Sequence, residues 1–183
     1  IQPGAKVTQQ AKKNKEYNDQ FIINDFVING QGCGNIAKMK FGCKTLSWSG
    51  CEVIAVYNTI KLLGDSARIQ DVVYYYDNGH DWANGIFGVE PKHISDLLTD
   101  SNEGYNYNVT KHEANTLSSF DNMNLNEGAY ILSWWNEDGV TIHTMAIYMN
   151  KEGNLSVYNY SNGSTKTRNY ESFSAMEDDN NGV

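Results

Sequence analysis

The sequence predicts an α+β domain, with helices in its first half and an antiparallel sheet in its second. Apolar side chains recur at helical spacing over 50–63 and 66–77. In contrast, β-branched and aromatic residues dominate 129–135, 140–149 and 155–160, which are separated by short turns. Because the helices precede the strands instead of alternating with them, the pattern favours α+β over α/β.

The composition indicates one folded domain and excludes several partners. The chain has 183 residues, of which 40% are hydrophobic, and this is enough for one domain with a buried core. Its 14 basic and 22 acidic residues give a net charge of −8, which argues against binding to nucleic acid or to anionic membranes. No apolar run reaches the ~18 residues of a membrane span. We expect a monomer with no nucleic-acid partner and no membrane span.

Three regions follow from the distribution of charge along the chain. Residues 1–20 are polar and rich in Lys, and predict a frayed N-terminal arm or a surface helix. Residues 21–176 form the expected domain, in which the aromatic and β-branched residues of 21–28 predict a first strand. Residues 177–183 are acidic and predict a loose tail. The chain begins with Ile1 and lacks a signal segment, which indicates a processed protein or an excised domain.

The helix predicted over 50–63 carries the first candidate for chemistry. Its apolar surface covers more than half of its circumference, so we expect it to be central and buried. Ser49 and Glu52 have the spacing of a capping box, which places Cys51 in the first turn. Unpaired N–H groups and the helix dipole favour a thiolate there. Gly50 is expected to keep the approach to the sulfur open, although a small buried residue that packs a helix start is the structural alternative for Cys51.

A histidine and an asparagine in the predicted sheet complete a candidate triad. A nucleophilic cysteine needs a base, and His143 lies on a strand, which would aim it rigidly. Asn159 lies on the next strand, and the turn over 151–154 makes the two strands antiparallel neighbours. The side-chain oxygen of Asn159 is expected to accept the Nδ1 hydrogen of His143 and to fix its tautomer. A core histidine and a turn-capping asparagine are the structural alternatives.

This order of elements resembles that of the papain-like cysteine peptidases. Within them it is most similar to the bacterial branch that includes the bacteriocin-processing double-glycine peptidases. The resemblance spans about residues 41–176 and implies a papain-like fold, in which an N-terminal helical half with a central Cys-bearing helix packs on a C-terminal antiparallel sheet. The matching segments are Trp48-Ser49-Gly50-Cys51-Glu52-Val53-Ile54-Ala55, Gly88-Val89-Glu90-Pro91 at the start of a third helix, Gly128-Ala129-Tyr130-Ile131-Leu132, Asn159 with Gly163, and Tyr170-Glu171-Ser172-Phe173.

The resemblance implies roles for individual residues and a class of substrate. Cys51 would attack a carbonyl, His143 would remove the thiol proton, and Asn159 would orient His143. The substrate would be a peptide or protein, and no cofactor or metal would be needed. Three further residues are expected to contact the substrate: Trp48, Gly50 and Trp135. By analogy with the family, the protein would be exported from a bacterium, or would be the toxin domain of an effector with a dedicated protein inhibitor.

One position departs from the family pattern. Members of the family place a Gln about six residues before the Cys as an oxyanion-hole donor, whereas Thr45 stands here. The hole would then use the Cys51 N–H together with Thr45, Ser47, the Trp48 indole or Gln31. Loss of one such donor typically slows catalysis roughly 100- to 1,000-fold. Three functions therefore stay open: a peptidase, another thiol acyl-transfer enzyme such as a deamidase or transglutaminase, and a catalytically silent peptide-binding module.

The remaining Cys and His residues give weaker signals. His80 lies near Asp77 and Asp81 in the sequence, but the group lacks the spacing that places several ligands on one metal. We therefore expect no metal site. Cys33 and Cys43 are consistent either with a disulfide or with two free thiols.

Overall fold

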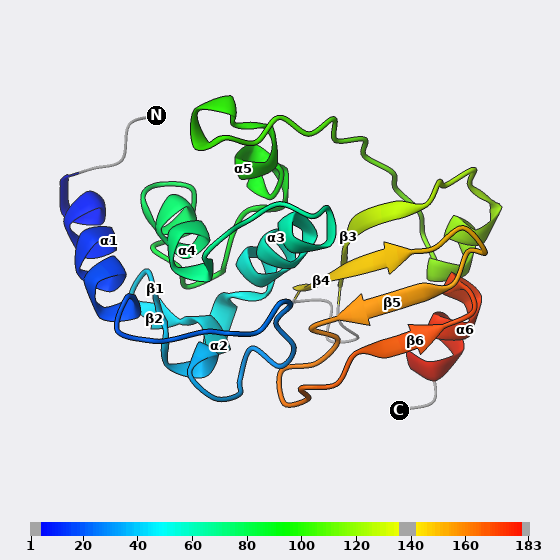
Figure 1. Ribbon diagram of the computed structural model, residues 1–183, viewed down its shortest axis with the longest axis horizontal. Helices are drawn as coiled ribbons and strands as arrows, with labels where there is room; N and C mark the ends of the chain where they lie inside the picture. Colours follow the sequence, from blue (N-terminus) through cyan, green and yellow to red (C-terminus); the bar gives the residue numbers. More distant parts are fainter. Residues whose placement is uncertain (1–4, 136–141, 181–183) are drawn as a thin grey trace.

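The computed structural model describes residues 5–135 and 142–180, and it confirms the α+β class (Figure 1). The helices are α1 (Ala5–Asn18), α2 (Leu46–Ser49), α3 (Cys51–Leu62), α4 (Ile69–Asp77), α5 (Asp96–Thr99) and α6 (Phe173–Asn180). The short 3₁₀ helices are η1 (Ile36–Lys38), η2 (Pro91–His93), η3 (Ser101–Glu103) and η4 (Leu117–Asn122). The strands are β1 (Lys40–Phe41), β2 (Lys44–Thr45), β3 (Gly128–Trp135), β4 (Ile142–Met149), β5 (Leu155–Tyr158) and β6 (Arg168–Tyr170).

The larger sheet is an antiparallel meander in the order β3-β4-β5-β6, and β1 pairs with β2 in a small second sheet. The predictions of strands over 129–135 and 155–160 are confirmed as β3 and β5. The prediction over 140–149 is confirmed as β4, except that positions 140 and 141 lie outside the described residues. The chain leaves β5 at Asn159, which has a φ of 59°. This left-handed conformation suits Asn and ends the strand there.

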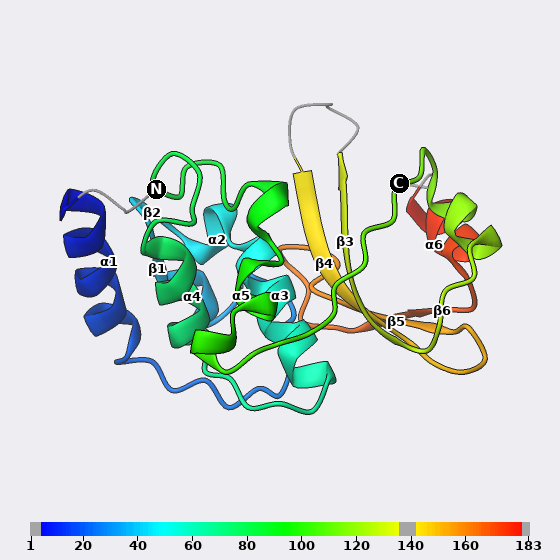
Figure 2. The ribbon, with the colours of Figure 1, turned by 90° about the horizontal axis from the view of Figure 1, so that it is seen from above.

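Helix α3 lies between the sheet and the helices α1 and α4, and it packs on β4 (Figure 2). Its prediction over 50–63 is confirmed within one residue at each end. Nearly all of its residues are buried, as the apolar pattern required. Two hydrophobic cores result. One surrounds α3 and α4 in the helical half, and the other lies between the sheet and α6.

The first helix is docked on the domain. Of the two alternatives for residues 1–20, a helix is present, and Ala11, Asn14 and Asn18 on one side of it are buried. The Asn14 amide donates hydrogen bonds to the Gly42 carbonyl at 2.8 Å and to the Asp77 carboxylate at 2.7 Å. Because both acceptors lie outside α1, this helix is attached to the rest of the helical half by specific polar contacts.

The strand predicted over 21–28 is wrong. This segment runs as irregular chain, although its residues have high strand propensity. The backbone N–H and C=O of Ile28 instead bond the side chain of Asn58 on α3, at 2.7 and 2.8 Å. An amide side chain therefore supplies the hydrogen bonds that a neighbouring strand would have supplied.

Three further boundaries differ from the predictions. The second helix begins at Ile69, three residues later than the pattern indicated, and Pro91 starts only a single 3₁₀ turn before the short α5. The acidic segment predicted to be a loose tail is helical up to Asn180, because it continues α6. In this helix Asp179 forms an ion pair with Arg168 of β6 at 2.6 Å. Within the described part of the chain, no helix has the length and apolarity needed to cross a membrane.

Candidate functional site

Cys51 is the first residue of α3, and a sharp turn at Gly50 precedes it. The predicted capping box is wrong, because Gly50 is the N-cap and the Ser49 hydroxyl donates to the Gly85 carbonyl. A Cβ atom at position 50 would lie 2.5 Å from the Leu46 Cδ2 and 2.8 Å from its Cα. Gly50 is therefore required by the tight packing of α2 against the start of α3, in addition to any effect on access to the sulfur.

The Cys51 sulfur lies against the backbone of β4 on both sides of His143. It is 4.0 Å from the Ile142 carbonyl oxygen, and it accepts from the Thr144 N–H. Strand β5 does not reach this part of β4, because its pairing stops where Tyr158 faces Ala146. The start of α3 therefore meets β4 beyond the end of β5, and this places Cys51 next to the strand position of His143.

The His143 ring contacts Asn159, but not in the expected manner. Its Nε2 lies 2.8 Å from the main-chain carbonyl oxygen of Asn159, whereas the sequence predicted a bond from Nδ1 to the side-chain oxygen. A carbonyl oxygen can only accept, so Nε2 carries the hydrogen of the neutral ring and Nδ1 is the basic atom. The left-handed turn at Asn159 directs its carbonyl toward the ring and its side chain elsewhere.

The side chain of Asn159 is fully buried and binds Gln31. The Gln31 backbone N–H donates to Asn159 Oδ1 at 3.0 Å, and Asn159 Nδ2 donates to Gln31 Oε1 at 3.1 Å. Gln31 Nε2 in turn faces the Ser47 carbonyl at 3.4 Å. Gln31 is itself buried, so it belongs to the framework of the site. Sequence reasoning had considered it only as an oxyanion-hole donor.

The environment of Cys51 favours the neutral thiol. Burial raises the pKa of Cys51 well above its ordinary value, and the neighbouring Glu52 carboxylate raises it further. The N–H groups of Thr144 and Glu52 act in the opposite direction but do not compensate. The expected thiolate is therefore disfavoured in the free protein, because burial outweighs the N–H groups that face the sulfur.

Glu52 is a buried carboxyl group beside the candidate nucleophile. Burial raises its pKa to about 7, against the opposing effects of its own N–H, the Cys51 thiol and the Val89 N–H. Its Oε2 is buried and has no hydrogen-bond partner among the described residues. A Cβ atom at Gly88, where φ is 79°, would lie 2.6 Å from this oxygen, so only Gly fits there. The sequence had suggested Glu52 only as a capping residue.

His143 is held as a neutral base. Burial lowers the pKa of its imidazole, while contacts with the main chain of Asn159 and Tyr160 raise it by less. The Trp134 ring lies beside it in a T-shaped arrangement, with the ring centroids 6.3 Å apart and the ring planes at 66°. At neutral pH the site therefore contains a neutral thiol and a neutral imidazole. Nucleophilic attack from this state requires proton transfer as the reaction proceeds.

The structure places the other predicted site residues in different surroundings. Thr45 is in β2, paired with Lys40, and the turn of α2 stands between it and Cys51. The Trp48 indole N–H, a candidate oxyanion donor, donates to the Ile86 carbonyl at 3.2 Å. Trp135 is 65% exposed at the end of β3 and pairs with Ile142, whose carbonyl faces the Cys51 sulfur.

Exposed apolar side chains gather beside α2, and sequence reasoning missed most of them. They form an aromatic patch: Trp48, Trp82, Ile86 and Phe87. The indole of Trp48 bonds the backbone of Ile86, and the rings of Trp82 and Phe87 lie 5.3 Å apart. The Lys44 ammonium lies over the Trp48 ring at 4.9 Å. Because α2 leads directly into Cys51, Trp48 is the member of the patch that lies close to the candidate nucleophile along the chain.

The histidine near Asp77 and Asp81 does not bind those carboxylates. His80 stacks on Tyr75 with the ring centroids 4.5 Å apart, and its Nδ1 is 3.5 Å from Asp96. Across the described ranges, no cluster of His, Cys, Asp and Glu is arranged to hold a metal. Of the two alternatives for the cysteines, the structure shows free thiols at Cys33 and Cys43.

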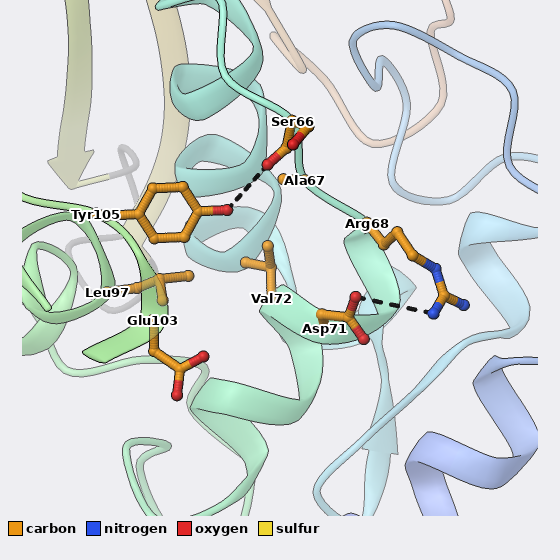
Figure 3. Close-up of a pocket in the computed structure, with 8 residues that line it drawn as sticks. All are labelled: Ser66, Ala67, Arg68, Asp71, Val72, Leu97, Glu103 and Tyr105. Atoms are coloured by element: carbon orange, nitrogen blue, oxygen red, sulfur yellow. Dashed lines mark hydrogen bonds and ion pairs between the residues drawn. The ribbon is translucent and has the colours of Figure 1, made fainter. Parts of the chain in front are cut away.

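A separate hollow of about 380 Å³ lies at the start of α4 (Figure 3). It is lined by Ser66, Ala67, Arg68, Asp71, Val72, Leu97, Glu103 and Tyr105. Arg68 pairs with Asp71, and the Tyr105 hydroxyl donates to the Ser66 carbonyl. The lining includes none of the candidate catalytic residues, so this hollow is not part of the site around Cys51.

Comparisons of the chain with family models, with curated proteins and with solved structures found no match in any of the three. The assignment of a function therefore depends on the geometry around Cys51 and His143.

Proposed function

We propose that the protein is a cysteine-dependent hydrolase with a papain-like arrangement, acting on peptide bonds. The observation that carries the proposal is the position of the Cys51 sulfur, which lies against the main chain on both sides of His143. A nucleophile at the start of a buried helix, beside a histidine aimed by a strand, is the arrangement that thiol acyl chemistry requires. Asn159 supports it, because its carbonyl holds the ring nitrogen that does not take part in proton transfer.

The proposed reaction starts from the neutral pair. His143 Nδ1 takes the thiol proton as the Cys51 sulfur attacks the substrate carbonyl, and the Cys51 N–H stabilises the oxyanion. This N–H is in the first helical turn and has no acceptor within the helix. His143 then protonates the leaving amine, and a thioester remains on Cys51. Water, deprotonated by His143, hydrolyses the thioester and restores the thiol.

The aromatic patch beside α2 supports a peptide as the substrate. Aromatic and aliphatic side chains that are exposed together often mark a binding surface. Trp48 at one end of the patch is three residues before Cys51, and Trp135 is the strand neighbour of Ile142. We therefore infer that the substrate carries a large apolar residue near the cleaved bond.

The proposal can be tested by digestion of a diverse peptide library. The wild-type protein should cleave library members, and Cys51→Ala should cleave none. Cys43→Ala is the matched control, because Cys43 is exposed and its loss should leave cleavage unchanged. Mass spectrometry of the products separates hydrolysis from deamidation and from cross-linking, which share the thioester intermediate. Equal cleavage by the wild type and Cys51→Ala would exclude the proposal.

A second candidate is a peptide-binding module without catalytic activity. The neutral, buried thiol favours it, as does Thr45 at the position where the family has a Gln. Such a module would retain peptides of the library on the immobilised protein and release them intact. Retention without cleavage by the wild type would therefore support this candidate and exclude the hydrolase.

A further inference from the structure

Gln31 connects the Asn159 turn beside His143 with helix α2, which leads into Cys51. It is 5% exposed and lies in the loop that follows Ile28. Its backbone N–H and its Oε1 form two hydrogen bonds with the side chain of Asn159, at 3.0 and 3.1 Å. The same loop holds the Asn159 backbone, because Asn29 Oδ1 accepts from the Asn159 N–H at 2.8 Å. Two residues of one loop thus fix Asn159.

The other side of this loop reaches the segment that leads into Cys51. Gln31 Nε2 faces the Ser47 carbonyl of α2 at 3.4 Å, and Asn162 Nδ2 donates to the same oxygen at 3.3 Å. The Gly32 N–H donates to the Asn162 carbonyl at 2.9 Å. A Cβ atom on Gly32 would lie 2.4 Å from Asn162 Oδ1, so the backbones approach as closely as a Gly allows.

We propose that Gln31 is a positioning residue, which fixes the Asn159 carbonyl opposite His143 and ties that turn to α2. The proposal rests on the proposed function for its meaning in catalysis. Asn159 has a left-handed backbone, which Asn adopts more readily than other residues with a side chain, and neighbouring contacts fix the orientation of its carbonyl. Without the Gln31 side chain, the turn keeps the bonds to the Gln31 N–H and to Asn29 but loses the one from Asn159 Nδ2, and its carbonyl is then held less firmly opposite the ring Nε2.

A suitable control is Asn58, another buried amide that bonds the same stretch of chain. It binds both backbone groups of Ile28, three residues before Gln31, but has no bond to Asn159 or to α2. Gln31→Met and Asn58→Leu each remove both polar atoms of a buried amide with little change in volume. Both variants should lose stability, so lost stability by itself does not distinguish the two roles.

The decisive measurement is the tautomer of His143, observed by ¹⁵N NMR of the imidazole at a pH where the ring is neutral. The wild type and Asn58→Leu should show predominantly the Nε2–H form, held by the Asn159 carbonyl. Gln31→Met should show a mixture of tautomers, because it removes the bonds of the Gln31 side chain to both Asn159 and the Ser47 carbonyl. An unchanged tautomer in Gln31→Met would overturn the proposal, as would an equal change in Asn58→Leu.

Catalysis provides a second readout. If the wild type cleaves peptides, Gln31→Met should lower kcat roughly 10- to 100-fold with little change in KM, as is typical when reacting groups are misplaced. An unchanged kcat would contradict the positioning role.

If the wild type cleaves no peptide, the proposed function fails, while the NMR measurement still tests the effect of Gln31 on His143. Should Gln31→Met not fold, Gln31→Asn takes its place, because its shorter side chain cannot bridge Asn159 and the Ser47 carbonyl, and an unchanged tautomer there would overturn the proposal.

Discussion

The His143 ring and the main-chain carbonyl of Asn159 are joined by a 2.8 Å contact through Nε2. The side chain of Asn159 takes no part in it and is committed to Gln31. The identity of residue 159 therefore matters for two separate reasons. A left-handed backbone is needed to present the carbonyl, and an amide is needed to pair with another amide.

Asn159→Asp should destabilise the protein, because Asn159 pairs with the buried amide of Gln31. A carboxylate cannot donate to Gln31 Oε1, and rotation of the Gln31 amide would instead leave its oxygen facing the Ser47 carbonyl. In either arrangement, two buried hydrogen-bond acceptors face each other with no hydrogen atom between them. We expect a loss of about 1–3 kcal/mol in the free energy of unfolding, measured by chemical denaturation.

Asn169→Asp is the matched control for that experiment. Asn169 is exposed and accepts from the Ser156 hydroxyl at 2.9 Å, a role that a carboxylate can keep. Its replacement should change stability by less than about 0.5 kcal/mol. Equal effects at the two positions would show that the amide pair with Gln31 contributes no specific stability.

Glu52 should make the folded state less stable as the pH rises through the weakly acidic range. Its pKa in the folded protein is about 7, above the ordinary 4.5, so the folded state retains a proton that the unfolded chain has lost. Stability therefore falls between pH 4.5 and 7, by about 3 kcal/mol if this group acts alone. Glu52→Gln should remove this fall, and denaturation curves at several pH values for both proteins measure it.

The exposed Glu103 offers a comparison for Glu52, since Glu103→Gln changes the same charge at the surface. The stability difference between Glu52→Gln and the wild type should grow with pH over this range. The difference for Glu103→Gln should stay small. A constant difference for Glu52→Gln would mean that its carboxyl group titrates normally in the folded protein.

Cys51 should react slowly with iodoacetamide in the free protein. Its thiol is buried and its pKa is raised, whereas Cys43 is exposed. Peptide mapping after brief alkylation at pH 7.5 should find Cys43 modified before Cys51. Glu52→Gln should speed the modification of Cys51, because it removes a charge that opposes the thiolate. Faster labelling of Cys51 than of Cys43 in the wild type would show that the thiol is already activated.

Helix α1 should contribute to the stability of the domain through Asn14. Replacement by Ala removes the two hydrogen bonds that Asn14 donates outside α1, and leaves the Gly42 carbonyl and one Asp77 oxygen without this donor. We expect a loss of about 2–3 kcal/mol in the free energy of unfolding. Lys13→Ala, at an exposed neighbouring position of the same helix, should have little effect. An equally small effect of Asn14→Ala would mean that α1 is not docked in solution.

Much of the fold could be predicted because its signals are local. The buried α3 and the strands β3, β4 and β5 each carry a repeat of apolar residues that depends only on neighbouring positions. Residues 21–28 show the limit of this reasoning, because their strand propensity is high but Asn58 replaces a strand partner. Strand formation depends on a partner elsewhere in the chain, and propensity carries no information about that partner.

The sequence by itself determined the α+β class, the position of Cys51 at the start of a buried helix and the position of His143 on a strand. Only the tertiary structure decided that the Asn159 carbonyl faces His143, and that Gln31 pairs with the Asn159 side chain. It also decided that burial of the Cys51 thiol outweighs the N–H groups that favour a thiolate. The physical reason is that hydrogen-bond partners and desolvation depend on groups distant in sequence, which become neighbours only when the chain packs.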